Sequence, residues 1–271
     1  MSEHSTLRLE EIARFAAEFD AAHSKGSTLD LPTKKFPDLN IEDAYLIQNA
    51  VAARWKSRGR KQAGYKAGLT SRAKMEQMNV GKPTFGVLMK DMCIPDGGGC
   101  EIDRLSRPRV EPEIAFVLKE DVADHFPNEQ EVIDAVDYVV PAIEIIDSRF
   151  RDYKLDLPSA IADNSSSAKY VIGGRPMRAD EIDLRTLGIV MLKNGTQVGV
   201  TAGAAVLGNP LRTVMLLSQW LAESGEHLPG GSLILTGGAS EAVPVSSGDV
   251  VCARFQDLGD VLVRFAGKGE E

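Results

Sequence analysis

Apolar residues in the first sixty positions recur at the spacing typical of helices. Residues 5–22 carry an apolar stripe with a period of about 3.6, the pattern of an amphipathic helix. The stripe consists of Leu9, Ile12, Phe15, Ala16 and Phe19. A second helix is predicted from Asn40, a favourable N-cap residue, to Gly59, a residue that favours helix ends. We expect the apolar faces of both helices to serve packing rather than chemistry.

Strand patterns predominate in the later part of the chain. Asn194-Gly195 separates two apolar runs and predicts a β-hairpin. Strands are predicted at 110–118, 139–146, 187–193, 197–201, 232–236, 249–256 and 261–265, and a turn followed by a short strand at 81–89. Further helices are predicted at 70–78, 129–136 and 210–224. Strands and helices do not alternate regularly as in a doubly wound sheet. We therefore predict an α+β fold, with a helical N-terminal region (residues 1–80) packed on a mixed, mostly antiparallel β core (residues 81–271).

The strand predicted over residues 110–118 has two chemically different faces. Alternate side chains of a strand point in opposite directions, so one face is apolar throughout and the other carries Glu111 and Glu113. Two carboxylates on one face repel each other unless a cationic group lies between them. Pro112 cannot donate a hydrogen bond to a neighbouring strand, which predicts a sheet edge, a strand start or a bulge at this point.

A third carboxylate, Glu144, interrupts the apolar run at residues 139–146. Such a run is usually buried on both faces, and a buried charge needs a partner. If Glu111, Glu113 and Glu144 converge, they form an oxygen-rich site suited to a hard divalent ion such as Mg²⁺ or Mn²⁺. The spacing fits equally well with two solvated edge glutamates and a Glu144 paired with an arginine.

Composition and charge narrow the class of protein. The chain has 271 residues, 43% of them hydrophobic, and a net charge of -8. The acidic surface argues against nucleic acid and anionic membranes as partners. The N-terminus has no signal-peptide core, and no apolar run approaches the roughly 18 residues of a membrane helix. The three cysteines form no CxxC motif and are typical of reduced thiols, so we predict a cytoplasmic protein.

Lys66 lies between Gly64 and Gly68, whose small size would let a ligand approach closely. A single lysine between turn glycines is more commonly a surface residue. Two polar stretches, residues 147–154 and 162–167, follow the strand of Glu144 and predict either a lined pocket or solvated connections.

Five motifs follow one another between residues 60 and 265. They are Gly64-Tyr65-Lys66-Ala67-Gly68-Leu69-Thr70-Ser71, Glu111-Pro112-Glu113-Ile114-Ala115-Phe116, Glu144-Ile145-Ile146-Asp147-Ser148-Arg149, Ala162-Asp163-Asn164-Ser165-Ser166 and Thr236-Gly237-Gly238. In these motifs the chain resembles the fumarylacetoacetate hydrolase superfamily, and within it the branch of 2-oxo-acid hydratases and 4-oxalocrotonate decarboxylases of aromatic meta-cleavage pathways. The resemblance implies a β-roll core that acts as one continuous catalytic unit.

The resemblance also implies the chemistry of the site. It implies Mg²⁺ or Mn²⁺ held by Glu111, Glu113 and Glu144, with the 1-carboxylate and 2-oxo oxygens of the substrate at further metal positions. Lys66 matches the lysine of the family motif and is expected to act as general acid/base. We expect its pKa to fall beside a divalent cation. Further substrate-binding residues are predicted to be Thr70, Ser71, Arg149, Lys154, Asp163, Ser165 and Thr236, with Arg149 and Lys154 near the distal carboxylate.

The resemblance implies that one position helps to distinguish the two activities of the branch. Hydratases carry an aspartate before the Phe/Tyr-Gly pair that follows the first motif, whereas here Thr84 precedes Phe85-Gly86. A hydroxyl is a poor substitute for a carboxylate that activates water. We therefore favour decarboxylation of 4-oxalocrotonate (2-oxohex-3-enedioate) to 2-hydroxypenta-2,4-dienoate. The alternatives are 2-hydroxypenta-2,4-dienoate (2-oxopent-4-enoate) hydratase and a non-catalytic structural paralogue.

The expected partners follow from this chemistry. The substrate would be a small 2-oxo dicarboxylate. We also expect a homo-oligomer, and a complex with a paralogous 2-oxopent-4-enoate hydratase that would take over the reactive dienol product.

Overall fold

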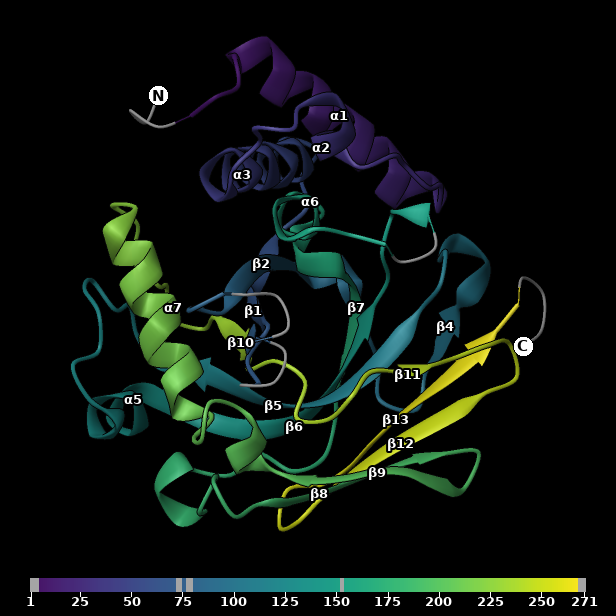
Figure 1. Cartoon of the computed structure of the whole chain (residues 1–271). Helices are drawn as coiled ribbons and strands as arrows, with labels where there is room; N and C mark the ends of the chain where they lie inside the picture. Colours follow the sequence, from purple (N-terminus) through teal and green to yellow (C-terminus); the bar gives the residue numbers. More distant parts are fainter. Residues whose placement is uncertain (1–4, 72–74, 77–79, 152–153, 268–271) are drawn as a thin grey trace.

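The computed structural model describes residues 5–71, 75–76, 80–151 and 154–267 (Figure 1). Its helices are α1 (Leu9–Lys25), α2 (Pro32–Lys35), α3 (Ile41–Ser57), α5 (Glu129–Ala135), α6 (Leu157–Ala162) and α7 (Leu211–Glu223). Its strands are β1 (Gln62–Gly68), β2 (Thr84–Met89), β3 (Cys93–Ile94), β4 (Gly99–Glu101), β5 (Arg109–Leu118), β6 (Val136–Ile146), β7 (Ser167–Ile172), β8 (Gly188–Lys193), β9 (Thr196–Ala202), β10 (Leu233–Leu235), β11 (Val243–Pro244), β12 (Val250–Phe255) and β13 (Gly259–Ala266).

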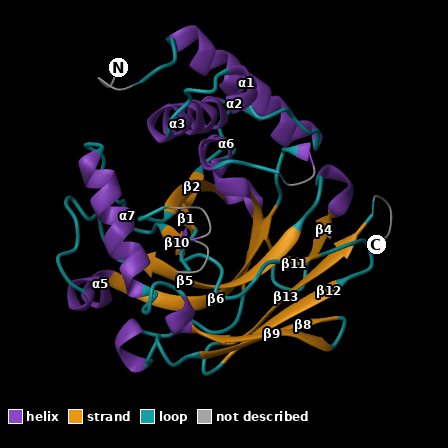
Figure 2. Cartoon of the chain, viewed as in Figure 1, coloured by secondary structure: helices purple, strands orange, loops and turns teal. Residues whose placement is uncertain are grey.

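The strands form two sheets. The larger has the order β2-β1-β10-β5-β6-β7-β3, with β11 also paired to β5, and the smaller has the order β4-β13-β12-β8-β9. Most pairs are antiparallel, while β1–β10, β3–β7 and β4–β13 are parallel. The predicted hairpin at Asn194-Gly195 is confirmed by the antiparallel pair β8–β9. Figure 2 shows the N-terminal helices on one side of the larger sheet and the smaller sheet on the other. The predicted α+β class is therefore confirmed.

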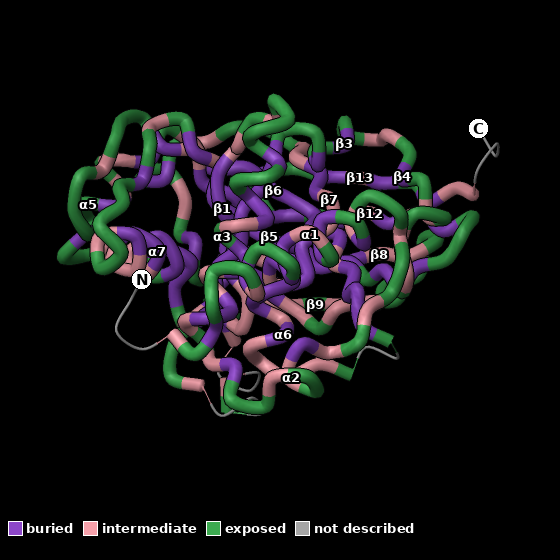
Figure 3. Tube along the Cα trace, turned by 90° about the horizontal axis from the view of Figure 1, so that it is seen from above, coloured by how far each residue is buried: buried purple, intermediate pink, exposed green. Residues whose placement is uncertain are grey.

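The N-terminal helices pack on the larger sheet through their apolar stripes. Phe19 of α1 and Trp55 of α3 share one buried cluster with Leu88 and Val140 of the sheet. The helix α3 begins as predicted, because the Asn40 side chain accepts a hydrogen bond from the Asp43 backbone N–H at 2.9 Å. The other face of the sheet packs against the smaller sheet in a second cluster. Figure 3 shows that buried residues gather along the central strands β5 and β6.

The predicted boundary at residue 80 stays a prediction. Strand β1 precedes residue 80 in the sequence and is hydrogen-bonded to β2 and β10 within the larger sheet. The helix predicted over residues 70–78 falls largely outside the described residues. Among the helices that the structure describes, none combines the length and the apolar character needed to cross a membrane.

The predicted strand start or bulge at Pro112 is wrong, but on one side of β5 no strand pairs with Pro112, because β10 pairs with residues 115–117 and β11 with residues 109–110. Pro112 is the fourth residue of β5, a central strand between β10 and β6, and the register shift in the β5–β6 pair lies at Val117/Leu118 instead. The Pro112 carbonyl accepts a hydrogen bond from the backbone N–H of Ala239, which belongs to the connection between β10 and β11. The N and C=O groups of one strand residue point to the same side, so the missing N–H of Pro112 faces this connection. No ladder hydrogen bond is lost.

Candidate active site

Three glutamates converge on one face of the larger sheet. Glu111 and Glu113 alternate along β5, and the register pairs Glu111 directly with Glu144 of β6. One oxygen from each carboxylate lies within 4.8 Å of the others, a geometry that could hold a metal ion. Glu113 and Glu144 are fully buried and Glu111 is 6% exposed. The alternative of two solvated edge glutamates is therefore wrong.

The partner of Glu144 is a lysine rather than an arginine. Lys66 Nζ lies 3.1 Å from Glu144 Oε2 and donates a hydrogen bond to the Ser165 carbonyl at 3.0 Å. The side chain is buried, so Lys66 is not a surface lysine. Its neighbour Gly68 lines the cavity, whereas a Cβ on Gly64 would lie 1.9 Å from the Leu233 carbonyl of β10. Gly64 thus permits close packing of two strands, and only Gly68 leaves room for a ligand.

The motif Thr236-Gly237-Gly238 packs directly on the glutamates. The Gly237 backbone N–H donates to Glu113 Oε2 at 2.7 Å, and Gly237 has a φ of +94° that favours glycine. A Cβ on Gly238 would lie 2.5 Å from Glu111 Cδ. The Thr236 hydroxyl donates to the Ile114 carbonyl at 2.9 Å and is fully buried. Thr236 does not line the cavity as predicted, and the two glycines that follow it contact the glutamates instead.

The charged groups of this cluster shift one another's pKa values. Burial, followed by repulsion from Glu144, raises the pKa of Glu113 well above its usual value. Burial also raises the pKa of Glu144, although Lys66 opposes it. Burial by itself would lower the pKa of Lys66, but Glu144, Glu113 and Glu111 together raise it. The fall in the Lys66 pKa expected beside a bound divalent cation stays a prediction, because these directions reflect the protein groups alone.

A second feature of this cluster concerns its carboxylate oxygens. Glu113 Oε1 and Glu144 Oε1 have no hydrogen-bond partner among the described residues. Both oxygens belong to buried carboxyl groups, and buried negative charges are unfavourable without a partner. A divalent cation bound by carboxylate oxygens would neutralise them and accept the free lone pairs.

The loop after α6 holds Lys66 from the opposite side. Asn164, Ser165 and Ser166 all have φ between +51° and +61°, a left-handed conformation that is unfavourable for residues other than glycine. The Asn164 side chain accepts from the Val87 N–H at 2.7 Å and donates to the Val87 carbonyl at 2.9 Å. These two bonds fix the turn that directs the Ser165 carbonyl toward Lys66. Sequence analysis places this loop near the site but does not identify Asn164.

A cavity of about 560 Å³ opens from Lys66 and Glu111. The predicted residues Ser71 and Ser165 line it, as does Thr84. Thr70 is buried beside it, where its side chain packs against Gly237. The remaining wall is partly apolar and partly charged, and includes Arg109, Ile146, Leu155, Leu157 and Glu241. Sequence analysis does not single out Arg109, although a spacing of two residues from Glu111 places it on the same strand face.

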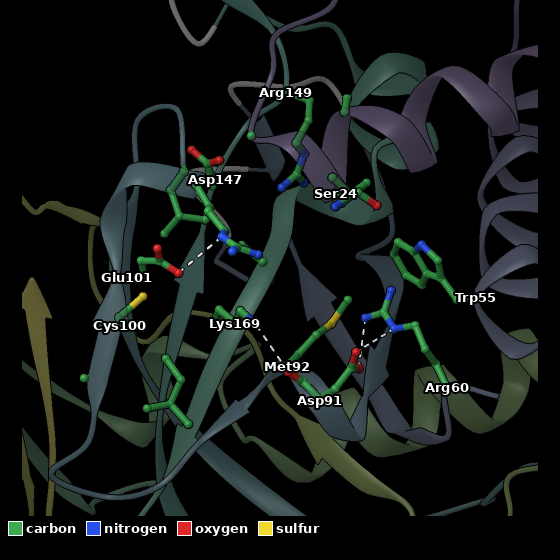
Figure 4. Close-up of a pocket in the computed structure, with 18 of the residues that line it drawn as sticks. Ser24, Trp55, Arg60, Asp91, Met92, Cys100, Glu101, Asp147, Arg149 and Lys169 are labelled. Carbon is green, nitrogen blue, oxygen red and sulfur yellow. Dashed lines mark hydrogen bonds and ion pairs between the residues drawn. The ribbon is translucent and has the colours of Figure 1, made fainter. Parts of the chain in front are cut away.

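The structure does not bring Arg149 and Asp163 to this cavity. Arg149 Nε lies 2.6 Å from Asp163 Oδ1, and His23 Nε2 lies 3.4 Å from the same oxygen. Arg149 and His23 line a separate cavity of about 600 Å³, into which Figure 4 shows Arg149 pointing. Lys154 is exposed and lines neither cavity. Of the two cations predicted to meet a distal carboxylate, Arg149 thus belongs to a buried ion pair with Asp163, and Lys154 lies on the surface.

Comparison with known proteins finds similar decarboxylases and hydratases that match most of the chain. The chain is 45% identical over 260 residues to a 4-oxalocrotonate decarboxylase from Pseudomonas putida, covering 96% of this chain and 98% of that protein. It is 41% identical over 230 residues to a 2-keto-4-pentenoate hydratase from Paraburkholderia xenovorans, covering 85% and 86% of the two chains. The chain belongs to the 4-oxalocrotonate decarboxylase and 2-keto-4-pentenoate hydratase family. No model of a protein family matches it.

Solved structures agree with this family. The 4-oxalocrotonate decarboxylase from Pseudomonas putida G7, complexed with magnesium and adipate, is 44% identical with a TM-score of 0.94, covering 97% of this chain and all of that chain. A fumarylpyruvate hydrolase from Pseudomonas aeruginosa is 18% identical with a TM-score of 0.60, over 76% of this chain and 90% of that chain. The second likeness concerns the fold alone, and agrees with the predicted fumarylacetoacetate hydrolase-like architecture.

Proposed function

We propose that the protein catalyses the metal-dependent decarboxylation of 4-oxalocrotonate to 2-hydroxypenta-2,4-dienoate. The observation that carries the proposal is the convergence of Glu111, Glu113 and Glu144 beside Lys66. The similarity to 4-oxalocrotonate decarboxylases over nearly the whole chain supports the same reaction. The presence of all four groups argues against a non-catalytic structural paralogue.

The donor set fits Mg²⁺ or Mn²⁺. Both ions prefer carboxylate oxygens, and Glu113 Oε1 is a buried oxygen with no hydrogen-bond partner among the described residues. We assign Glu111, Glu113 and Glu144 as the residues that would hold the ion. When bound, the ion supplies a Lewis acid near the 2-oxo oxygen, where negative charge develops in the reaction.

Lys66 supplies the proton that the reaction consumes. The bond between the distal carboxyl carbon and the chain breaks, and its electron pair moves through the conjugated system to the 2-oxo oxygen. The substrate dianion plus one proton gives CO₂ and the dienol monoanion, so atoms and charges balance. Lys66 Nζ is held at the cavity by Glu144 and the Ser165 carbonyl, where it can donate the proton as a general acid. Each tenfold rate increase requires about 1.4 kcal/mol of preferential transition-state stabilisation.

The cavity wall favours decarboxylation over hydration. Thr84 lines the cavity within 3.4 Å of the Ser165 hydroxyl, and neither hydroxyl is basic enough to activate water. Ile146, Leu155 and Leu157 form an apolar wall. An apolar environment destabilises a carboxylate more than the neutral CO₂ that it releases.

The test is to follow CO₂ release and ultraviolet absorbance after mixing the protein with Mg²⁺ and 4-oxalocrotonate. We expect CO₂ release that is abolished by EDTA and by Glu111→Gln. Metal-dependent consumption of 2-hydroxypenta-2,4-dienoate without CO₂ release would instead identify a hydratase.

We further propose that the protein forms a homo-oligomer. We also propose that it associates with a paralogous hydratase, because the dienol product ketonises in water unless the next enzyme takes it over. The family includes such hydratases. Size-exclusion chromatography of the two enzymes purified together should give a shared peak, and separate peaks would contradict the association.

A further inference from the structure

Arg109 occupies a defined place relative to the glutamates. It is the first residue of β5, and its register partners are Ile146 of β6 and Pro244 of β11. Alternation along the strand puts it on the same face as Glu111 and Glu113. It lines the same cavity as Lys66 and Glu111.

The spacing along β5 matches the length of a small dicarboxylate. Two residues of an antiparallel strand span about 6.8 Å, so the Cα atoms of Arg109 and Glu111 are separated by about this distance. This separation is comparable to that between the two carboxylates of an extended six-carbon diacid. A ligand with one end at the glutamate cluster could therefore reach the Arg109 side chain with its other end.

The charges of the cavity give Arg109 a specific role. Lys66 and Arg109 are the cationic residues among the described lining residues, and Lys66 lies at the glutamate end of the cavity, 3.1 Å from Glu144 Oε2. Glu111 and Glu241 line the same cavity and would repel a second carboxylate. A guanidinium matches the planar geometry of a carboxylate and offers two parallel N–H donors.

We propose that Arg109 recognises the distal carboxylate and makes this site selective for 2-oxo dicarboxylates over 2-oxo monocarboxylates. The proposal rests on the function proposed above and names the residue that determines its substrate class. It replaces Arg149 and Lys154 in that role, because neither of them lines the cavity.

The exposure of Arg109 suits a carboxylate that must leave. A tight, buried ion pair would stabilise the substrate as much as the transition state and would not accelerate CO₂ loss. Arg109 is exposed, so water screens its interaction with the carboxylate. It can orient the distal carboxylate against the wall of Ile146, Leu155 and Leu157 without holding it firmly. We therefore expect Arg109 to affect KM more than kcat.

The test compares two ligands that differ only in the distal carboxylate. Isothermal titration calorimetry of the Mg²⁺-loaded protein would measure 2-oxoadipate and 2-oxohexanoate. We expect the wild type to prefer the diacid by about tenfold, the size of one charge-assisted hydrogen-bonded contact. Arg109→Gln should remove most of this preference by weakening the diacid alone, and Arg109→Lys should restore part of it.

Lys154→Gln is the matched control, because it removes one positive charge from an exposed residue outside the cavity. It should keep the wild-type preference. A full preference in Arg109→Gln, or its loss in Lys154→Gln, would overturn the proposal. With 4-oxalocrotonate as substrate, Arg109→Gln should raise KM about tenfold and leave kcat within about threefold.

The binding experiment does not depend on turnover, so the two proposals can fail separately. A diacid preference that requires Arg109 in a protein without CO₂ release would keep the carboxylate site and reject the decarboxylase. CO₂ release together with an unchanged diacid preference in Arg109→Gln would support the decarboxylase and reject the carboxylate site at Arg109.

Discussion

Two buried clusters of carboxylates and cations lie on either side of one loop. In one, Asp163 faces both Arg149 and His23. In the other, Glu111, Glu113 and Glu144 lie close together, and Lys66 Nζ lies 3.1 Å from Glu144 Oε2. The Asp163 cluster sets one carboxylate against a permanently charged arginine, whereas the glutamate cluster brings three buried carboxylates together.

The pKa directions of the two clusters are opposite for this reason. Burial by itself raises the pKa of Asp163, but Arg149 and His23 bring it below its usual value. The pKa of Glu113 is raised well above its usual value, because burial and Glu144 outweigh Lys66. The comparison teaches that burial alone does not distinguish a structural charge from a functional one. The arrangement of charge does, since the glutamate cluster brings three carboxylates together and leaves Glu113 Oε1 and Glu144 Oε1 without a hydrogen-bond partner among the described residues.

The loop of residues 163–166 connects the buried Asp163–Arg149 pair to the Lys66 side of the glutamate cluster. Asp163 is held by Arg149, and the next residues, Asn164 and Ser165, form the left-handed turn that carries the carbonyl facing Lys66. The structural pair thus anchors one end of the turn that orients the proposed acid.

The largest expected effect is that of Glu144→Gln, which should reduce activity without reducing stability. Glu144→Gln should lower the rate of CO₂ release by about 10³-fold, because it removes a proposed metal ligand and the partner of Lys66. The same change removes one of three mutually repelling buried carboxylates. Thermal melting in EDTA should therefore show equal or higher stability. A large loss of stability in EDTA would make the glutamate cluster structural, like that of Asp163.

Asp163→Ala should lower the free energy of unfolding by about 3–5 kcal/mol, because Arg149 is left buried without its partner. Urea denaturation would measure this. Asp180→Ala is the matched control, since the ion pair of Asp180 with Arg178 is exposed, and it should leave stability almost unchanged. Equal effects of the two substitutions would show that the buried pair has no special importance.

The dependence of stability on pH should differ between the clusters. The raised pKa values of Glu113 and Glu144 mean that the folded state binds more protons than the unfolded state above the usual glutamate pKa of 4.5. In EDTA their contribution to stability should therefore fall as the pH rises through the raised values. Asp163 has the opposite sign, since its contribution is lost as the pH falls through its lowered pKa.

Added Mg²⁺ should reverse the trend of the glutamates. At about 100 times its Kd, Mg²⁺ should add about 2.7 kcal/mol of stability where the carboxylates are ionised. Metal binding displaces protons from the ligands, so the gain should be smaller near pH 5.5 than near pH 8. Thermal melting with and without Mg²⁺ at both pH values would measure it. An equal gain at both would contradict raised pKa values at the metal ligands.

The smallest expected effect concerns the turn that joins the clusters. Asn164→Ala loses two hydrogen bonds to Val87 and should lower CO₂ release about tenfold with little change in KM. Asn164→Gly tolerates the left-handed φ but loses the same bonds, so it separates the side chain from the backbone conformation. Full activity in Asn164→Gly but not in Asn164→Ala would assign the role to the backbone conformation rather than to the hydrogen bonds.

Local patterns in the sequence were sufficient for the elements and for part of the site. The alternation along β5 places Glu111 and Glu113 on one face whatever the rest of the fold does. Asn40 and Asn194-Gly195 mark a helix start and a hairpin through interactions within a few residues. The ordered motifs add the family and, with it, the expectation that Lys66 and Glu144 join the site.

Contacts between distant residues were decided only by the tertiary structure. The register of β5 and β6 sets Glu144 against Glu111, and the larger sheet brings Lys66 within 3.1 Å of Glu144. Arg149 was predicted to meet a substrate carboxylate, yet it meets Asp163. The sequence predicts a sheet edge, a strand start or a bulge at Pro112, and the structure places it in a central strand, at a point where neither β10 nor β11 pairs with it. The direction of a side chain is a local property of one strand. The partner of a charged group and the neighbours of a strand depend on which distant segments the tertiary fold brings together.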